Sequence, residues 1–248
     1  MAMNGWQRVA TAGGLALAAA CGGEQAADGT AVGTLPDSVV TVPAVPTVTV
    51  AAVAPNSYAG TLPCADCAGI ATTVALFSDT TYRLREAYQG KSAAPVVSMG
   101  RWTHDGRTLT LDGLGRMLRF AVKGEDTLSL LDQSGQPIAG SAPVTLVRAD
   151  SMDALREAAP YTGTFTYEAD APSFRECGSG QTYHVLMSGA YKTVRRAYAA
   201  AKLPAGSGQQ IEVTVRFTAR PATMEGPKER DVMEFVKYVG PAANPDCR

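Results

Sequence analysis

The sequence predicts a mainly β protein with two domains: an up-and-down, lipocalin-like β-barrel, then a smaller OB-like barrel that carries one helix. Short alternating segments begin near Tyr58 and recur about eight times over some 90 residues. Each segment is joined to the next by a short turn. Consecutive hairpins on this scale are typical of a closed barrel, which leaves no exposed edge. Further strands then surround a single helical segment in about 80 residues, as in a small OB-like fold.

Individual segments carry this prediction. Residues 70–76 place Ile70, Val74 and Leu76 on one face of a strand, and Asp105-Gly106 is a strong hairpin signal. In residues 211–217 apolar and polar side chains alternate without a break, which is the clearest strand pattern in the chain. Residues 190–201 place Tyr191, Val194 and Tyr198 on one stripe and predict a helix.

The charge balance excludes several classes of function. The chain has 248 residues, with 22 Lys and Arg against 23 Asp and Glu, so its net charge is near zero. That argues against nucleic-acid binding through bulk charge. Only two His residues occur, which excludes a His-rich metal site. No Ser/His/Asp arrangement, phosphate loop or separated carboxylate pair calls for catalysis, so we expect no enzyme and no catalytic residues.

The N-terminus has the features of a targeting segment. Residues 9–20 are a run of small apolar residues that is too short for a bilayer span of about 20 residues. Leu17-Ala-Ala-Ala20 before Cys21 resembles the bacterial lipobox, which implies cleavage before Cys21 and lipidation of its thiol. An ordinary signal peptide cut elsewhere is the alternative. Because Gly22 rather than Asp follows the cysteine, we expect the outer membrane.

The expected organisation has five parts. They are a signal peptide (1–20), a lipidated, disordered tether (21–56), the first barrel (57–149), a connector helix (150–160) and the OB-like domain (161–248). Pro residues interrupt the tether, which is otherwise rich in Val, Thr and Ala; an edge strand is the alternative there. Ser151 is the predicted cap of the connector helix, and Pro160 ends it.

Five cysteines leave four thiols once Cys21 is lipidated. An exported protein lies in an oxidising compartment, where disulfides persist. Four remaining cysteines, an even number that can pair completely, fit such a compartment. Cys64 and Cys67 could form a structural disulfide in a rim loop, exchange with other thiols, or bind copper(I) after reduction. A Met such as Met99 is a conceivable extra copper ligand. Cys177 and Cys247 remain as a second pair, structural or redox-sensing.

The segment Tyr58-Ala-Gly-Thr-Leu-Pro-Cys64-Ala-Asp-Cys67-Ala-Gly-Ile70 resembles the start of the NlpE-type copper-resistance lipoprotein domain. The resemblance covers about residues 58–148, although Ala68 stands where the family has Pro. The region around Phe174 and Cys177 resembles the second domain that often follows in such lipoproteins. The resemblance implies an outer-membrane location, copper tolerance, and envelope-stress or surface sensing.

We therefore expect a non-enzymatic, lipid-anchored outer-membrane protein that senses envelope stress, including copper, through an envelope signalling partner. Two alternatives stay open: a lipocalin-like carrier for a small apolar ligand, and a purely structural envelope module. A wide cavity lined by Leu118, Phe120 and Leu130 would favour the carrier, whereas a filled core would favour the sensor.

Overall fold

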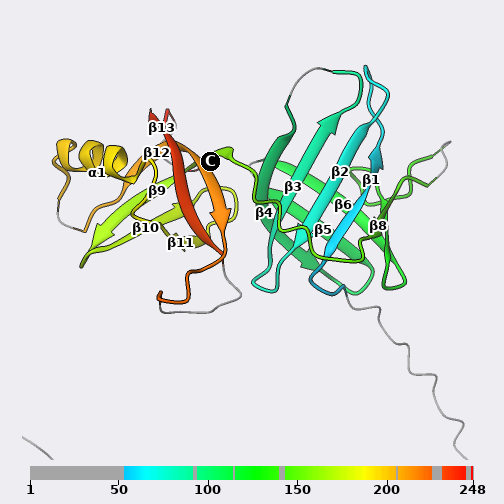
Figure 1. Cartoon of the computed structure of the whole chain (residues 1–248). Coiled ribbons are helices and arrows are strands. Elements are labelled where there is room, and N and C mark those ends of the chain that lie inside the picture. Colours follow the sequence, from blue (N-terminus) through cyan, green and yellow to red (C-terminus); the bar gives the residue numbers. More distant parts are fainter. Residues whose placement is uncertain are drawn as a thin grey trace, which may run out of the picture. The chain divides into compact units, whose positions relative to one another are not determined.

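The structure is a computed structural model. It describes residues 53–91, 94–113, 115–139, 143–204, 206–224, 231–243 and 247. The predicted signal peptide, the lipidation site at Cys21 and the tether up to residue 52 lie outside the described residues. The described part is built mainly from strands, with one α-helix, in a closed barrel and a separate five-stranded sheet (Figure 1). This confirms the predicted fold class.

Eight antiparallel strands form the barrel, each paired with its neighbours in chain order. They are β1 (Ser57–Leu62), β2 (Ile70–Leu76), β3 (Thr81–Tyr88), β4 (Val96–His104), β5 (Thr108–Gly113), β6 (Arg116–Lys123), β7 (Thr127–Leu130) and β8 (Thr145–Arg148). The barrel closes because β1 pairs with β8, with Tyr58 opposite Arg148 and Gly60 opposite Leu146. Gly60 is required there, since a Cβ would lie 2.3 Å from the carbonyl oxygen of Thr145.

Apolar side chains from all around the barrel fill its interior. Leu109, Leu111 and Phe120 are each 0% exposed, and they pack with the buried residues Tyr58, Leu62, Val74, Leu76, Tyr82, Leu84, Leu128 and Leu146. Each large apolar side chain that is fully buried stabilises the fold by about 1.5–3 kcal/mol. This core therefore supplies much of the free energy that holds the barrel together.

The second sheet has the order β11-β10-β9-β12-β13. Its elements are β9 (Ala159–Glu168), β10 (Ala171–Glu176), β11 (Thr182–His184), α1 (Tyr191–Ala200), β12 (Gln209–Thr218) and β13 (Val232–Pro241). The segment after β11 reaches β13, where the Leu186 N–H donates to the Met233 carbonyl at 2.8 Å and the Ala190 N–H to the Phe235 carbonyl at 2.7 Å. These bonds curl the sheet around its core.

Aromatic residues dominate the core of the second domain. Phe235 lies 5.9 Å from Phe165 and 5.6 Å from Phe174 between ring centroids, and all three rings are 0% exposed. Helix α1 adds Tyr191 and Val194 to this core, as the stripe in the sequence predicts. Edge-to-face and tilted pairs of this kind add about 0.5–1.5 kcal/mol beyond the burial of their area.

The predicted connector helix over residues 150–160 is wrong. Residues 152–158 contain no regular secondary structure, and β9 already begins at Ala159. The backbone groups that a helix would use are bonded elsewhere: Ser57 Oγ donates to the Asp153 carbonyl at 3.0 Å and accepts from the Asp153 N–H at 2.8 Å. Leu155 has a φ of +45° and is fully buried. Tertiary hydrogen bonds and burial therefore override a weak helical signal.

Arg83 is the largest departure from the alternation pattern, which places it on the solvent face of β3. It is only 2% exposed. Its guanidinium lies 4.6 Å from the Phe77 ring centroid and 3.5 Å from that of Phe217. Its Nη1 donates to the Ala154 carbonyl at 2.7 Å and to Asp231 Oδ2 at 2.9 Å. This buried cation therefore links β3, the connector and the start of β13.

Candidate functional site

Cys64 and Cys67 lie in the loop between β1 and β2, at one end of the barrel. They are joined by a disulfide with a Cα–Cα distance of 5.3 Å. Both cysteines are half-buried, and Asp66 between them is exposed. Pro63 follows the last residue of β1, and because it cannot donate to a strand ladder, the strand ends before the cysteines. Since neither cysteine is fully buried, the pair is accessible from solvent.

Neighbouring residues fix the shape of this loop. The Gly69 carbonyl accepts from the Gln89 N–H at 2.9 Å. A Cβ on Gly69 would lie 2.5 Å from Thr61 Cγ2, so a larger residue would push the loop away from β1. Lys91 Nζ forms an ion pair with Asp66 Oδ2 at 2.9 Å. Because both side chains are well exposed, that pair contributes at most about 1 kcal/mol.

The two sulfurs and one carboxylate form a compact donor set. One ligand atom from each of Cys64, Asp66 and Cys67 lies within 4.8 Å of the others. Thiolates are the preferred ligands of copper(I), so the reduced pair fits this ion, whereas the disulfide must first be opened. Met99 is not part of this cluster: it is 2% exposed and belongs to the hydrophobic core that contains Tyr161 of the second domain.

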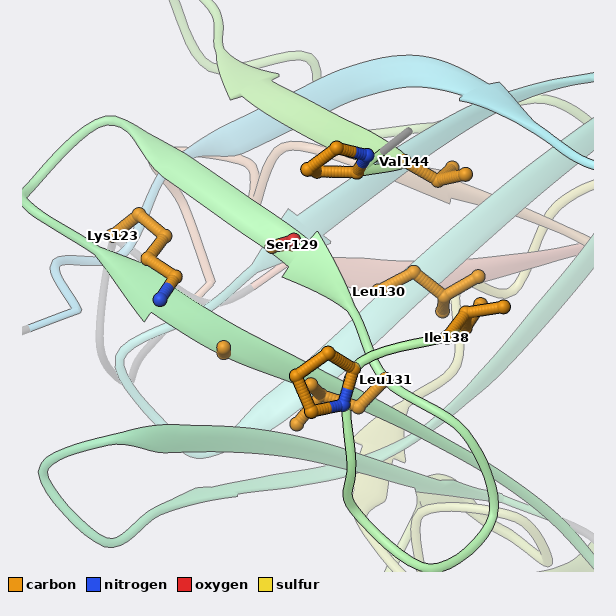
Figure 2. Close-up of a pocket in the computed structure, with 9 residues that line it drawn as sticks. Lys123, Ser129, Leu130, Leu131, Ile138 and Val144 are labelled. Atoms are coloured by element: carbon orange, nitrogen blue, oxygen red, sulfur yellow. The ribbon is translucent and has the colours of Figure 1, made fainter. Parts of the chain in front are cut away.

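Among the described residues, apolar side chains fill the barrel interior, where a carrier would need a wide cavity. Phe120 is fully buried in the core, and Leu118 and Leu130 pack against that core. A pocket of about 190 Å³ lies instead beside β6 and β7 (Figure 2). Leu130 lines it together with Leu131 and Ile138, but Leu118 and Phe120 do not. The filled core favours the sensor over the carrier.

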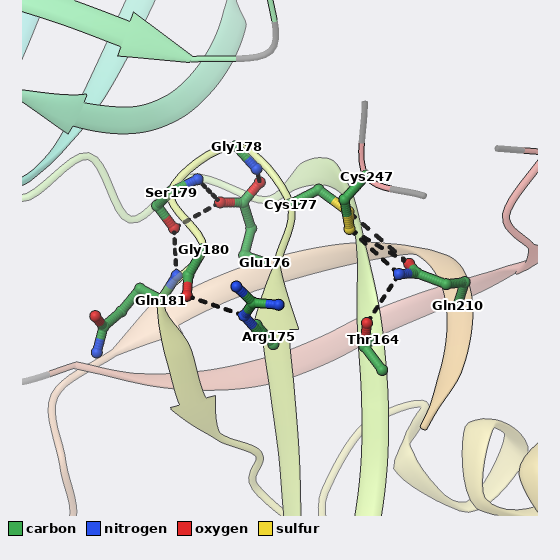
Figure 3. Close-up of a disulfide and its surroundings, with 10 residues drawn as sticks. All are labelled: Thr164, Arg175, Glu176, Cys177, Gly178, Ser179, Gly180, Gln181, Gln210 and Cys247. Atoms are coloured by element: carbon green, nitrogen blue, oxygen red, sulfur yellow. Dashed lines mark hydrogen bonds between the residues drawn. A yellow bond between two sulfur atoms is a disulfide. The ribbon is translucent and has the colours of Figure 1, made fainter. Parts of the chain in front are cut away.

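Cys177 and Cys247 form the second disulfide (Figure 3), with a Cα–Cα distance of 4.9 Å. It joins residues 70 positions apart. Cys177 follows the last residue of β10, and its N–H donates to the Thr162 carbonyl at 2.9 Å. The bridge therefore ties residue 247 to the end of a strand pair in the second sheet. Both cysteines are half-buried.

A buried carboxylate lies in the chain directly before this bridge. Glu176 is 1% exposed. It accepts hydrogen bonds from the Gly178 N–H, the Ser179 N–H and Ser179 Oγ, each at 2.7 Å. Burial raises the pKa of the Glu176 carboxyl, and these bonds oppose that rise. The carboxylate thereby holds the turn that leads from β10 to β11.

The sequence patterns miss the environments of three residues in the structure. Glu176 occupies an inward position of a strand, where alternation predicts an apolar residue. Gln210 stands beside the second disulfide (Figure 3), although no motif marks it. Arg83 lies on the face that alternation assigns to solvent. In each case a tertiary contact, which the local sequence does not encode, decides the environment.

Within the described residues, no helix is long and apolar enough to cross a membrane. The NlpE N-terminal domain family matches residues 58–141. The family described as the NlpE C-terminal OB domain matches residues 155–248. The first match covers β1 to β7 of the barrel apart from Ser57, and the second covers all strands of the second sheet. They confirm the resemblance in the first domain and the OB-like expectation in the second.

Comparison with individual proteins gives the same family. The chain is 35% identical to Lipoprotein NlpE of Escherichia coli (strain K12) over 169 residues, which cover 66% of this chain and 69% of that protein. The crystal structure of the Cpx pathway activator NlpE from Escherichia coli matches at 28% identity and a TM-score of 0.34, covering 78% of this chain and 97% of that one. A solved protein of Shewanella oneidensis matches at 33% identity and a TM-score of 0.35, covering 40% and 90%. On the two domain matches and the 35% identity to Lipoprotein NlpE, the chain belongs to the NlpE lipoprotein family.

Proposed function

We propose that this protein is a non-enzymatic, lipid-anchored sensor of envelope stress at the bacterial outer membrane, and that copper is one of the stresses it reports. The observation that carries the proposal is the match to both NlpE domains together with 35% identity to Lipoprotein NlpE. The solved Escherichia coli relative is described as a Cpx pathway activator. By inference, the present chain acts on an envelope signalling protein.

Copper(I) would be held by Cys64 and Cys67 in their reduced state. Two thiolates at one exposed loop suit a soft cation, and the hard carboxylate oxygen of Asp66 adds little to its affinity. Reduction of the disulfide must come first, because a disulfide sulfur carries no thiolate charge. In this proposal two stresses act on the same loop: more reducing conditions in the envelope open the disulfide, and copper(I) then binds the two thiolates.

Replacing both Cys64 and Cys67 by Ser is expected to abolish high-affinity copper(I) uptake by the reduced protein. The uptake is measured by titration against a coloured copper(I) chelator. The matched control is the Cys177→Ser, Cys247→Ser variant, which removes the other thiol pair and should still bind one copper(I). Asp66→Asn should bind as the parent does. Unchanged uptake by the Cys64→Ser, Cys67→Ser variant would contradict the proposed site, because copper(I) would then be held by other residues of this protein.

Replacing Cys21 by Ser is expected to release the protein from membranes, because the lipid is attached to that thiol in this proposal. Membrane and soluble fractions are compared by immunoblotting, and the mass of the purified protein reports the acyl chains. The Cys64→Ser, Cys67→Ser variant should stay in the membrane fraction. Density separation of the two membranes tests the outer-membrane location. A Cys21→Ser protein that remains wholly membrane-bound refutes the lipid anchor.

A further inference from the structure

The Cys177–Cys247 disulfide has different surroundings at its two sulfurs. Gln210 Nε2 lies 3.2 Å from Cys247 Sγ and donates an N–H to it (Figure 3). Against Cys177 Sγ, the same side chain presents its oxygen, at 3.8 Å. The amide oxygen also lies 3.7 Å from Cys247 Sγ. The sulfur of Cys247 therefore has an amide donor within hydrogen-bonding distance.

The Gln210 amide is held in place from both sides. Gln210 stands on β12 opposite Thr164 on β9, and its Nε2 also donates to Thr164 Oγ1 at 2.9 Å. The Gln210 backbone carbonyl accepts from the Ala242 N–H at 3.0 Å, which holds the end of β13 beside it. Because the strand pairing fixes the backbone and Thr164 fixes the amide, the donor is already oriented before any reaction.

We propose that Gln210 makes Cys247 the leaving group when an external thiol opens this disulfide, so that the attacking thiol is directed to Cys177. The inference concerns the second disulfide alone and does not depend on copper binding at Cys64 and Cys67. It assigns Gln210 the part of a positioning residue that decides which sulfur departs.

The exchange proceeds in two balanced steps. The thiolate of a dithiol reductant bonds to Cys177 Sγ, the Sγ–Sγ bond breaks, and its electron pair stays on Cys247 as a thiolate. The Gln210 N–H donates to that thiolate, and a hydrogen bond to an ionised acceptor is stronger than one to a neutral sulfur. The second thiol of the reductant then displaces the Cys177 thiolate and leaves as the cyclic or protein disulfide. Both cysteines end reduced, and the reductant has lost two electrons and two protons.

The direction follows from the leaving group. In thiol–disulfide exchange the sulfur that forms the more stable thiolate departs faster, and which sulfur is attacked depends on that difference. A hydrogen bond that forms to a charged group is worth about 1.4 kcal/mol or more, which corresponds to about a tenfold preference. Both cysteines are half-buried, so exposure alone does not choose between them.

The test is the position of the first mixed disulfide. The oxidised full-length protein is treated briefly with limiting glutathione, quenched with acid, alkylated and digested, and the adducts are measured by mass spectrometry. We expect about tenfold more glutathione on Cys177 than on Cys247. In Gln210→Leu, the ratio should fall to within about twofold of unity, and reduction by dithiothreitol should slow about threefold to tenfold.

Two further variants and a control separate this role from a structural one. Gln210→Glu keeps the shape but places a carboxylate beside Cys247, so the ratio should invert and reduction should be slower than in Gln210→Leu. Thr164→Val frees the amide and should lower the ratio part of the way. Gln209→Leu changes the neighbouring side chain and should leave the ratio at its parent value. Melting curves of the oxidised variants verify that each one folds.

Three results would overturn the proposal. An adduct ratio near one in the parent protein, or an excess on Cys247, would show that the amide does not direct the attack. A ratio that stays tenfold in Gln210→Leu would assign the preference to another group. An equal loss of the preference in Gln209→Leu would mean that the sheet, rather than the amide donor, decides the outcome.

Discussion

Replacing Asp231 by Ala is expected to lower the free energy of unfolding by about 3–5 kcal/mol, because it leaves the buried Arg83 guanidinium without its carboxylate. Arg83 is 2% exposed and Asp231 7%, so water cannot replace the lost partner. Arg156, whose Nη2 lies 2.7 Å from Asp231 Oδ1, also loses its ion pair. Denaturant unfolding followed by far-UV circular dichroism measures the change.

The matched control is Glu157→Ala, which breaks the ion pair between Arg85 and Glu157 at the surface. With the Glu157 side chain 44% exposed, that change should cost no more than about 1 kcal/mol. Removing both buried charges, in Arg83→Met with Asp231→Ala, should restore part of the lost stability, since no charge is then left unpaired. A loss below about 1 kcal/mol in Asp231→Ala would show that the Ala154 carbonyl alone satisfies Arg83.

Removing the Cys177–Cys247 bridge, by changing both residues to Ser, is expected to lower the unfolding free energy of the second domain by about 4 kcal/mol. The bridge spans 70 residues, and a cross-link of that length removes considerable entropy from the unfolded chain in the loop-closure model. Denaturant titration under non-reducing conditions, followed by near-UV circular dichroism of the tyrosines in that domain, measures the loss.

The other disulfide provides the comparison. Cys64 and Cys67 are three positions apart, so the same model gives their removal a cost of only about 1.5 kcal/mol. The fluorescence of Trp102, on β4 of the barrel, reports that change. Similar losses from the two double variants would contradict the entropic account and point to contacts around the bridges in the folded state.

The sequence predicts the elements in which local pattern and tertiary environment agree. In β12, the inward positions Ile211, Val213, Val215 and Phe217 are all apolar and all buried. The stripe of α1 likewise faces the core. In such segments the spacing of the apolar residues indicates both the secondary structure and the buried face, so both can be predicted from the sequence alone.

The rest depends on contacts between distant residues. The inward positions of β10 are Pro172, Phe174 and Glu176. Because Glu176 is charged, the alternation of apolar and polar residues is broken there, and the sequence does not indicate that this position is buried. The connector fails as a helix because Ser57, 96 positions from Asp153 in the sequence, bonds its backbone. The cysteine residues of the candidate site can be identified from the sequence, whereas Gln210 lies beside Cys247 only because β9 and β12 pair.

The pairing of β1 with β8 also constrains the order in which the barrel can fold. Residues 58 and 148 are partners across the closing seam, so the first strand gains its neighbour on that side only when β8, about 90 residues further along the chain, is in place. Pairings between distant residues form slowly, and unpaired strand edges invite association with other chains. Until β1 and β8 pair, a sheet assembled from the intervening strands has two exposed edges, and closure of the seam removes both of them.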